Sequence, residues 1–231
     1  METNGTINTC TVTKNSISCF DLLTADELDV LRENTLEVTY KKGENICKQG
    51  TFASHVMLIE DGLVKVYLEG NNETLVLKIL QAVNMIGLTS LIEGNNIFQY
   101  SAQAYVPTTI KLIEINAFKE IVSSNAQFAL KVISLLNANT IITYGRFFCL
   151  TKKHTYGRLA DILLCLSNRV YKSKIFPLQL SRKELAELAS MSIESIARIL
   201  TKFKEDELIN ITPDFIEILE PERLDTISQN G

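Results

Sequence analysis

Residues 181–203 carry two short helical patterns separated by a tight polar break. Ser181 and Glu184 have the spacing of a capping box, and the apolar residues after them recur at helical intervals. The pattern is interrupted at 190–192, where Ser192 is placed to cap a second helix. The stretch therefore predicts a helix-turn-helix, an element that places its second helix in the major groove of DNA.

The second predicted helix divides into an apolar and a polar face. The side expected to be buried carries Ile196, Ile199, Leu200 and Phe203. On the polar side we assign Glu194, Ser195 and Arg198 to base contacts, because Arg pairs with guanine and Glu accepts from cytosine in the first turn of such helices. The alternative is that Glu194 and Arg198, four residues apart, form an ordinary ion pair on a solvated face.

Charge is concentrated around this element although the whole chain has a net charge of −4. Residues 151–204 hold eleven Lys or Arg against four Asp or Glu, while residues 205–231 hold one against eight. A local basic region is what neutralising a phosphate backbone requires. The residues expected to contact phosphates are Lys152, Lys153, Arg182, Lys183, Lys202 and Lys204.

Composition is that of an ordinary globular protein, with 46% apolar and 22% charged residues in 231. The N-terminus is polar and the chain has no run of eighteen apolar residues, so we expect neither a secretory signal nor a membrane partner, and a cytoplasmic location. Residues 1–16 and 226–231 are polar and expected to be loose.

Five cysteines are scattered along the chain without any C-x-x-C spacing: Cys10, Cys19, Cys47, Cys149 and Cys165. This disfavours a disulfide framework and a structural zinc site, and reduced thiols are the expectation. With only two histidines, a His-rich metal site or a His-dependent catalytic arrangement is not expected, so we predict neither a metal site nor an enzyme.

Periodicity divides the chain into three regions. Residues 1–115 read as short strands separated by turn signals such as Asp61-Gly62, preceded by a short helix at 24–34. Residues 116–150 are helical, and residues 151–231 combine a helix at 156–170 with the helix-turn-helix and a hairpin around Pro213. The predicted fold is α+β: an N-terminal antiparallel, jelly-roll-like β-roll, a long dimerisation helix and a C-terminal winged helix-turn-helix.

The predicted long helix has a row of mostly apolar residues at heptad spacing from Phe128 to Cys149, which also contains Asn139 and Arg146. Heptad spacing favours a dimer seam, and a polar residue at one core position can fix its register. The residues assigned to the seam are Val132, Leu135, Asn139 and Ile142. The alternative is a helix that packs on its own β domain.

Five segments, in this order, resemble the Crp/Fnr family of bacterial transcription regulators over about residues 20–220. They are Gly43-Glu44-Asn45-Ile46-Cys47-Lys48-Gln49-Gly50, Ile59-Glu60-Asp61-Gly62-Leu63-Val64-Lys65-Val66-Tyr67, Gly157-Arg158-Leu159-Ala160-Asp161-Ile162-Leu163-Leu164, Leu180-Ser181-Arg182-Lys183-Glu184-Leu185-Ala186 and Ile193-Glu194-Ser195-Ile196-Ala197-Arg198-Ile199-Leu200. The resemblance implies a homodimer on double-stranded DNA with a two-fold symmetric, TGA-like site, and RNA polymerase as a partner. Ser190 and Glu207 stand where the family often has Gly.

The effector pocket that the resemblance implies is degenerate here. Family members that bind cyclic nucleotides use a Glu for the ribose and an Arg for the phosphate. The corresponding residues, Gly87, Leu88, Tyr100 and Ser101, lack both anchors. Because a buried phosphate without a cation costs several kcal/mol, cyclic nucleotide binding is not expected.

Other cofactors of the family fit no better. Cys10, Cys19 and Cys47 are too few for the usual four ligands of an iron–sulfur cluster, and haem ligation through His55 stays open. Our main hypothesis is a homodimeric DNA-binding transcription regulator controlled by an unidentified signal at the β-roll. The alternative is a ligand- or redox-binding β-roll protein whose DNA domain is secondary.

Overall fold

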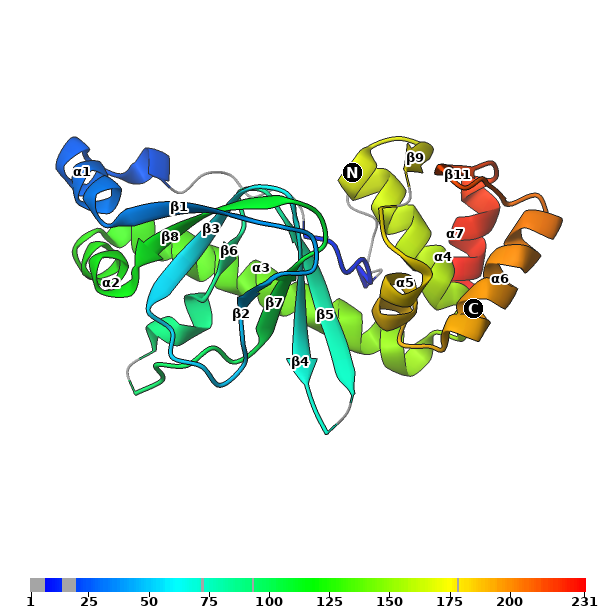
Figure 1. The fold of residues 1–231 in the computed structure, drawn as a ribbon, viewed down its shortest axis with the longest axis horizontal. Helices are drawn as coiled ribbons and strands as arrows, with labels where there is room; N and C mark the ends of the chain where they lie inside the picture. The colour runs from blue at the N-terminus through cyan, green and yellow to red at the C-terminus, as the bar shows by residue number, and fades with distance from the viewer. Residues whose placement is uncertain (1–6, 14–19, 72, 93, 178) are drawn as a thin grey trace. The chain divides into compact units, whose positions relative to one another are not determined.

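A computed structural model describes residues 7–13, 20–71, 73–92, 94–177 and 179–231 (Figure 1). The chain forms two compact units. The β-roll unit comprises residues 13–73 and 79–141, and the C-terminal unit comprises residues 142–231 together with 74–78 and the residues up to Val12. The division at 141 differs from the predicted boundaries at 115 and 150, because one helix continues across it.

The β-roll consists of two antiparallel four-stranded sheets, as predicted. The first, in spatial order, contains β1 (Thr35–Tyr40), β8 (Thr108–Glu114), β3 (His55–Asp61) and β6 (Met85–Ile86). The second contains β2 (Asn45–Cys47), β7 (Ser101–Ala104), β4 (Leu63–Glu69) and β5 (Thr74–Gln81), of which residues 74–78 of β5 are counted above with the C-terminal unit. The β3–β4 turn requires glycine: Gly62 has φ 112°, and a Cβ there would collide with Thr108.

The helices of this unit cover its apolar face. Helix α1 (Ala25–Glu33), within the helix predicted at 24–34, begins at a capping box formed by Thr24 and Glu27, and α2 (Ile115–Ser124) follows β8 directly. Two short 3-10 turns, η1 (Phe20–Leu22) and η2 (Leu88–Leu91), complete the set. The Phe118 and Phe128 rings meet edge to face, with 5.4 Å between their centroids, in a core shared by the helices and the first sheet.

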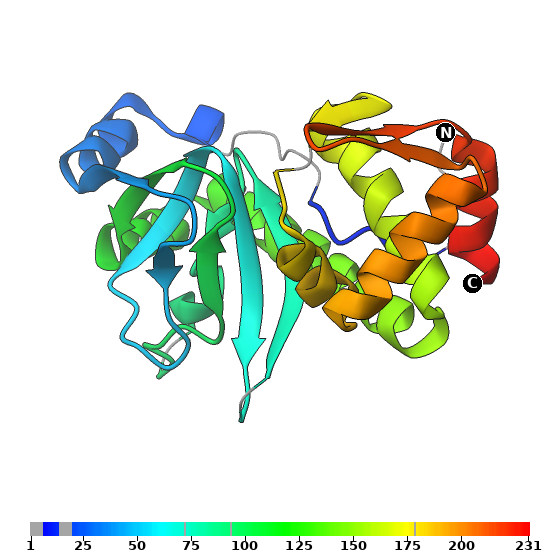
Figure 2. The same cartoon turned by 45° about the vertical axis from the view of Figure 1, so that its right-hand side comes forward.

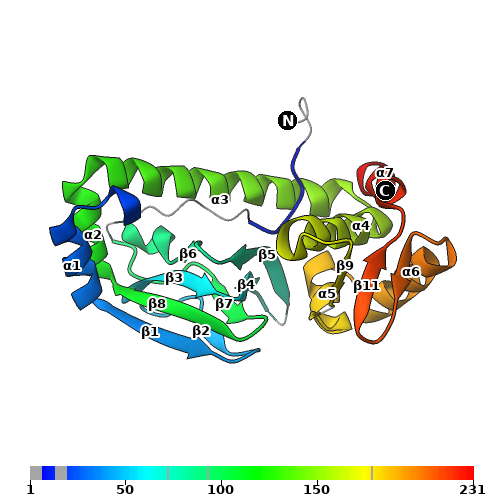
Figure 3. The same cartoon turned by 90° about the horizontal axis from the view of Figure 1, so that it is seen from above.

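The predicted single helix over residues 116–150 is divided at Asn125 into α2 and a longer helix, α3 (Ala126–Lys152) (Figure 3). Two of the four predicted seam residues face their own β-roll: Val132 is buried in its core, and the partly buried Leu135 packs against that core. A different set of apolar side chains on α3 lies exposed. It comprises Leu130, Ile133, Ile141, Tyr144, Phe147 and Phe148.

The C-terminal unit is a winged helix-turn-helix, as predicted (Figure 2). Its elements are α4 (Thr155–Cys165), a π-helical continuation η3 (Leu166–Tyr171), β9 (Ile175–Pro177), α5 (Arg182–Ala189), α6 (Ile193–Glu205), β10 (Ile209–Ile211), β11 (Phe215–Ile218) and α7 (Pro221–Asn230). The wing is a three-stranded sheet in the order β10-β11-β9. The C-terminal residues expected to be loose instead form part of α7, where Ser228 is buried against α4.

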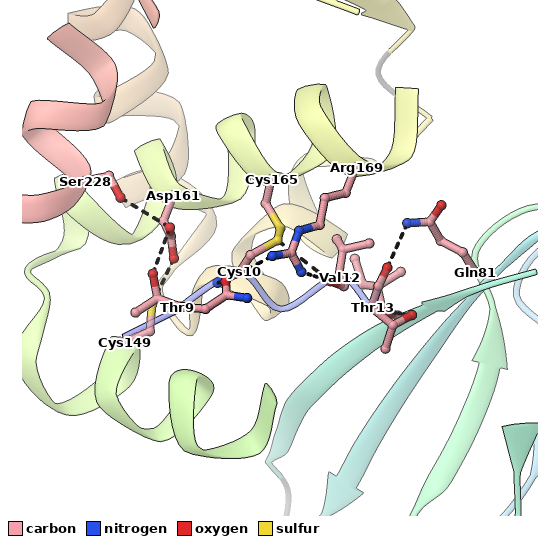
Figure 4. Close-up of a disulfide and its surroundings, with 12 residues drawn as sticks. Thr9, Cys10, Val12, Thr13, Gln81, Cys149, Asp161, Cys165, Arg169 and Ser228 are labelled. Atoms are coloured by element: carbon pink, nitrogen blue, oxygen red, sulfur yellow. Dashed lines mark hydrogen bonds between the residues drawn. A yellow bond between two sulfur atoms is a disulfide. The ribbon is translucent and has the colours of Figure 1, made fainter. Parts of the chain in front are cut away.

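Two expectations about the N-terminus are also wrong. Within the predicted loose segment 1–16, the side chains of Thr9, Thr11 and Val12 are buried. Cys10 forms a disulfide with Cys165, so these two thiols are not reduced (Figure 4). No helix in the described ranges is long and apolar enough to cross a membrane.

Candidate nucleic-acid interface

The helix-turn-helix is fixed by the caps that the sequence predicts. The Ser181 hydroxyl accepts the Glu184 amide at 3.2 Å, and the Glu184 carboxylate accepts the Ser181 amide at 2.6 Å. Helix α5 ends at Ser190, which adopts a left-handed conformation with φ 50°. This is the conformation that glycine normally provides, so the turn forms without it at a steric cost.

Helix α6 begins at Ser192, whose hydroxyl accepts the Ser195 amide at 3.2 Å. The predicted apolar side is buried through Ile196, Ile199, Leu200 and Phe203. The opposite side carries Glu194 and Arg198, both exposed, and the half-buried Ser195. The structure therefore brings the three base-contact candidates together on one face of one capped helix.

The ordinary alternative for this face, an ion pair between Glu194 and Arg198, is not formed in the described part of the chain. The Glu194 carboxylate instead accepts hydrogen bonds from its own backbone amide and from Ser192, and these lower its pKa. Glu194 stays an ionised acceptor at the positive end of the helix dipole. Arg198 keeps a guanidinium that can pair bidentately with guanine.

Five of the six predicted phosphate-contact residues are exposed: Lys152, Arg182, Lys183, Lys202 and Lys204. The Lys202 ammonium also pairs with Asp206, Nζ to Oδ1 2.9 Å, and this pair raises the pKa of Lys202. Its charge is shared, so a phosphate contact would compete with an i,i+4 ion pair.

Lys153 lies elsewhere and does not offer the exposed ammonium that a phosphate contact needs. Its side chain is only 9% exposed and pairs with Asp161 at 3.3 Å. Its ammonium also donates to the hydroxyls of Thr9 and Ser228, each at 2.9 Å. The sequence could not indicate this, because the partners are far from Lys153 along the chain.

A buried arginine supports the turn between the two helices. Arg146, which the heptad pattern places with the seam, is 2% exposed and donates to the Val76 carbonyl at 2.9 Å and to the Ser190 hydroxyl at 3.2 Å. Arg158 of α4 donates to the Ser190 carbonyl at 3.3 Å. The sequence signal for this role was a charged residue in a heptad row whose other members, apart from Asn139, are apolar.

The degenerate effector stretch in the β-roll is closed by its own side chains. The Gly87 amide donates to the Tyr100 hydroxyl at 3.0 Å, and burial raises the pKa of Tyr100 to about 12. Leu88 is buried, and the Ser101 hydroxyl donates to Glu69 at 3.0 Å. These residues offer a neutral phenol and an apolar side chain where a cyclic nucleotide needs a cation and an acceptor, so a cyclic nucleotide does not fit them.

A separate cavity of about 560 Å³ lies between α1 and the first sheet of the β-roll. Leu28, Leu31 and Leu58 contribute apolar walls, and the Glu60–Lys111 ion pair stands among its lining residues. Its size and mainly apolar lining are those of a small-molecule site.

The side chains that could ligate a metal or a cofactor do not lie close together in the described residues. In the described ranges no three His, Cys, Asp or Glu are placed to hold a metal. Cys10 is crosslinked, Cys47 is buried with its pKa raised by desolvation to about 12, and Cys19 lies outside the described residues. His55 holds its Nδ1 2.8 Å from the Ser54 hydroxyl.

Two family models match the two units of the chain. Residues 37–125 match the cyclic nucleotide-binding domain, and residues 157–227 match the Crp-like helix-turn-helix domain. The chain belongs to the Crp/Fnr family. It is a DNA-binding transcription regulator with a sensory β-roll domain, as the sequence predicts.

Curated relatives and solved structures agree with this assignment. This Crp/Fnr regulator is 24% identical over 189 residues to the transcriptional activator protein Anr of Pseudomonas protegens, covering 80% of this chain and 77% of Anr. It is 27% identical over 192 residues to the nitrogen fixation regulation protein FixK of Rhizobium meliloti, covering 82% and 85%. The fold matches FixK2 of Bradyrhizobium japonicum with a TM-score of 0.75 at 18% identity, covering 84% of this chain and 96% of FixK2. It matches a Crp/Fnr regulator of Eubacterium rectale with a TM-score of 0.75 at 19% identity, covering 92% and 98%.

Proposed function

We propose that this Crp/Fnr regulator is a cytoplasmic homodimer that reads a two-fold symmetric DNA site with Glu194, Ser195 and Arg198 of α6. The observation that carries the proposal is an exposed Arg198 without an ion pair to Glu194, one turn into a capped helix. Each subunit of a two-fold dimer offers one such helix, so the half-sites lie about 34 Å apart. The family resemblance favours a TGA-like core in each half, with Arg198 on its guanine.

The exposed apolar residues of α3 support the dimer. Ile133, Ile141 and Tyr144 are each more than half exposed and lie along one side of the helix. A long row of this kind is unfavourable in water, and pairing with the same row of a second copy removes it from solvent. The proposed seam therefore uses these residues in place of Val132 and Leu135, which pack against the β-roll.

The proposed signal acts on the β-roll and is not a cyclic nucleotide, and the proposed output is contact with RNA polymerase.

The proposed DNA site is tested by selection of duplexes from a random pool by the purified protein, followed by gel shifts. An enriched palindrome with half-sites one helical turn apart is the expected result. Enrichment of unrelated sequences, or binding that depends on salt but not on sequence, would contradict the proposal.

The second candidate is a ligand-binding β-roll protein whose DNA domain is secondary. The cavity of about 560 Å³ beneath α1 supports it. The same selection discriminates between the two candidates, because a secondary DNA domain would not enrich one site.

A further inference from the structure

Residues 8–12, which we call the strap, are tied to the C-terminal unit by a disulfide (Figure 4). Cys10 is crosslinked to Cys165, the last residue of α4, with 5.6 Å between their Cα atoms. This separation is in the ordinary range for a disulfide. The strap also passes so close to α3 that a Cβ at Gly145 would meet the Asn8 carbonyl. The glycine leaves room for the strap.

Hydrogen bonds hold the strap on either side of the crosslink. The Arg169 guanidinium donates to the Val12 carbonyl at 2.7 Å and to the Asn8 side chain at 3.1 Å. The Thr9 hydroxyl donates to the Asp161 carboxylate at 2.9 Å. Both partners belong to the α4–η3 helix, so the strap is bound along one side of it.

The strap completes a buried ion pair. Lys153 and Asp161 are nearly buried, and the hydroxyls of Thr9 and Ser228 each bond with both of them. Removing the strap would take away Thr9 and open one side of this pair to water. A nearly buried pair that loses a hydrogen-bonding partner is destabilised, so the order of the strap and of α7 is coupled.

A small reductant reaches the crosslink from the side of Cys10, which is half-buried, since Cys165 itself is only 5% exposed. Both cysteines line a cleft of about 420 Å³, together with Asp161, Arg169 and Asp225. A regulator that works on DNA shares its compartment with thiol reductants, and disulfides that form there are usually transient and redox-sensing. Accessibility and compartment both argue against a purely structural role.

We propose that Cys10 and Cys165 form a reversible redox switch that clamps the strap when oxidised and frees it when reduced. The reductant is a dithiol. One of its thiolates attacks a protein sulfur to give a mixed disulfide, and its second thiolate then displaces the protein thiolate. The S–S bond between Cys10 and Cys165 is broken, two protein thiols form with two protons, and the dithiol leaves as its disulfide.

The switch reaches the DNA-binding surface through α4. Arg158 of α4 donates to the carbonyl of Ser190 in the turn before α6. Clamping α4 therefore orders the turn, and the oxidised protein binds DNA more tightly than the reduced protein. This consequence rests on the proposed function, whereas the switch itself rests only on the contacts of the strap.

The first experiment follows the thiols alone. Full-length protein is equilibrated in native buffer at set ratios of reduced to oxidised dithiothreitol, quenched in acid, unfolded and alkylated, and its mass is measured. Cys10 and Cys165 should gain alkyl groups together as the buffer becomes reducing, and lose them when it is returned to oxidising. The switch is wrong if the pair resists reduction until denaturant unfolds the protein, or is alkylated in every buffer.

The second experiment measures binding of the oxidised and reduced protein to a duplex selected by the oxidised form. Reduction should weaken binding on the order of 5-fold or more, a usual size for coupling between sites. Cys10→Ser should bind at the weaker level in every buffer, and Cys47→Ala, which leaves the crosslink, should follow the wild type. Equal affinities of the two forms would overturn the link to DNA. If neither form selects any duplex, the proposed function fails, and the thiol titration still decides the switch.

Discussion

The guanidinium of Arg146 in α3 donates a hydrogen bond to the hydroxyl of Ser190, at 3.2 Å, in the left-handed residue that ends α5. The same guanidinium donates to the Val76 carbonyl, at 2.9 Å. The turn before the proposed recognition helix is therefore supported by a buried cation from a different helix. The charge sits in the predicted heptad row because it points into the protein and not into a dimer.

Replacing Arg146 with Met should destabilise the C-terminal unit by about 2–4 kcal/mol, since buried acceptors then lose a charged donor. Ser190→Ala removes only one of these bonds and should cost about 1 kcal/mol. Urea unfolding followed by circular dichroism measures both. Equal costs for the two variants would show that Val76 contributes nothing to the role of Arg146.

Alkaline pH should destabilise the fold through the buried thiol of Cys47. Burial raises its pKa from 9 to about 12, so the fold favours the neutral thiol. The stability that this contributes is complete below pH 9 and is lost as the pH rises toward 12. The free energy of unfolding, measured with urea between pH 8 and 11, should decrease more steeply with pH for the wild type than for Cys47→Ala. Parallel profiles would contradict the burial of this thiol.

Cyclic AMP and cyclic GMP should neither bind nor change DNA affinity. The Tyr100 hydroxyl already accepts the Gly87 amide, and Leu88 offers no acceptor to a ribose. Isothermal titration calorimetry should give only the heat of dilution. Micromolar affinity for either nucleotide would mean that another part of the β-roll supplies the missing cation.

Local sequence patterns predicted the DNA-binding unit well. The caps at Ser181 and Ser192 and the buried side of α6 depend on residues within a few positions of one another, and all appear in the structure. The turns of the β-roll were predictable for the same reason, since glycine at a left-handed position such as Gly62 is a local requirement.

Contacts between distant segments were not predictable. Nothing near Cys10 indicates Cys165, which is 155 positions away. The sequence predicted Lys153 to be a basic surface residue. Its partners Asp161, Thr9 and Ser228 contact it only in the folded chain, so no local pattern reveals them. The heptad row of α3 also fits two interpretations equally, since a helix packed on its own domain and a dimer helix both need an apolar stripe.

The dimer should depend on the exposed row of α3. Ile141→Asp would place an unpaired carboxylate in the proposed seam, while Ile141 is 60% exposed in the single chain, so folding should be unaffected. Light scattering at micromolar concentration should then give a mass near 25.9 kDa in place of twice that value. Ala138→Asp, exposed on the same helix but to one side of the row, is the matched control and should stay dimeric.

Two variants of α6 should distinguish a residue that contacts a base from one that contacts a phosphate. Arg198→Ala should cost roughly 1–3 kcal/mol per half-site on the matched duplex, because a bidentate contact with guanine is lost, and preference at that base pair should relax. Lys202→Ala should weaken all sequences alike and reduce the salt slope by about one or less, because Lys202 shares its charge with Asp206.

The two effects are distinguished by measuring binding to matched and single-mismatch duplexes over a range of salt. Loss of a base contact changes the ratio between the two duplexes, whereas loss of a phosphate contact lowers both affinities together. If Arg198→Ala weakens matched and mismatched duplexes by the same factor, Arg198 contacts the backbone. The base-reading role would then pass to Glu194 and Ser195, whose Ala variants should shift the preference at neighbouring base pairs.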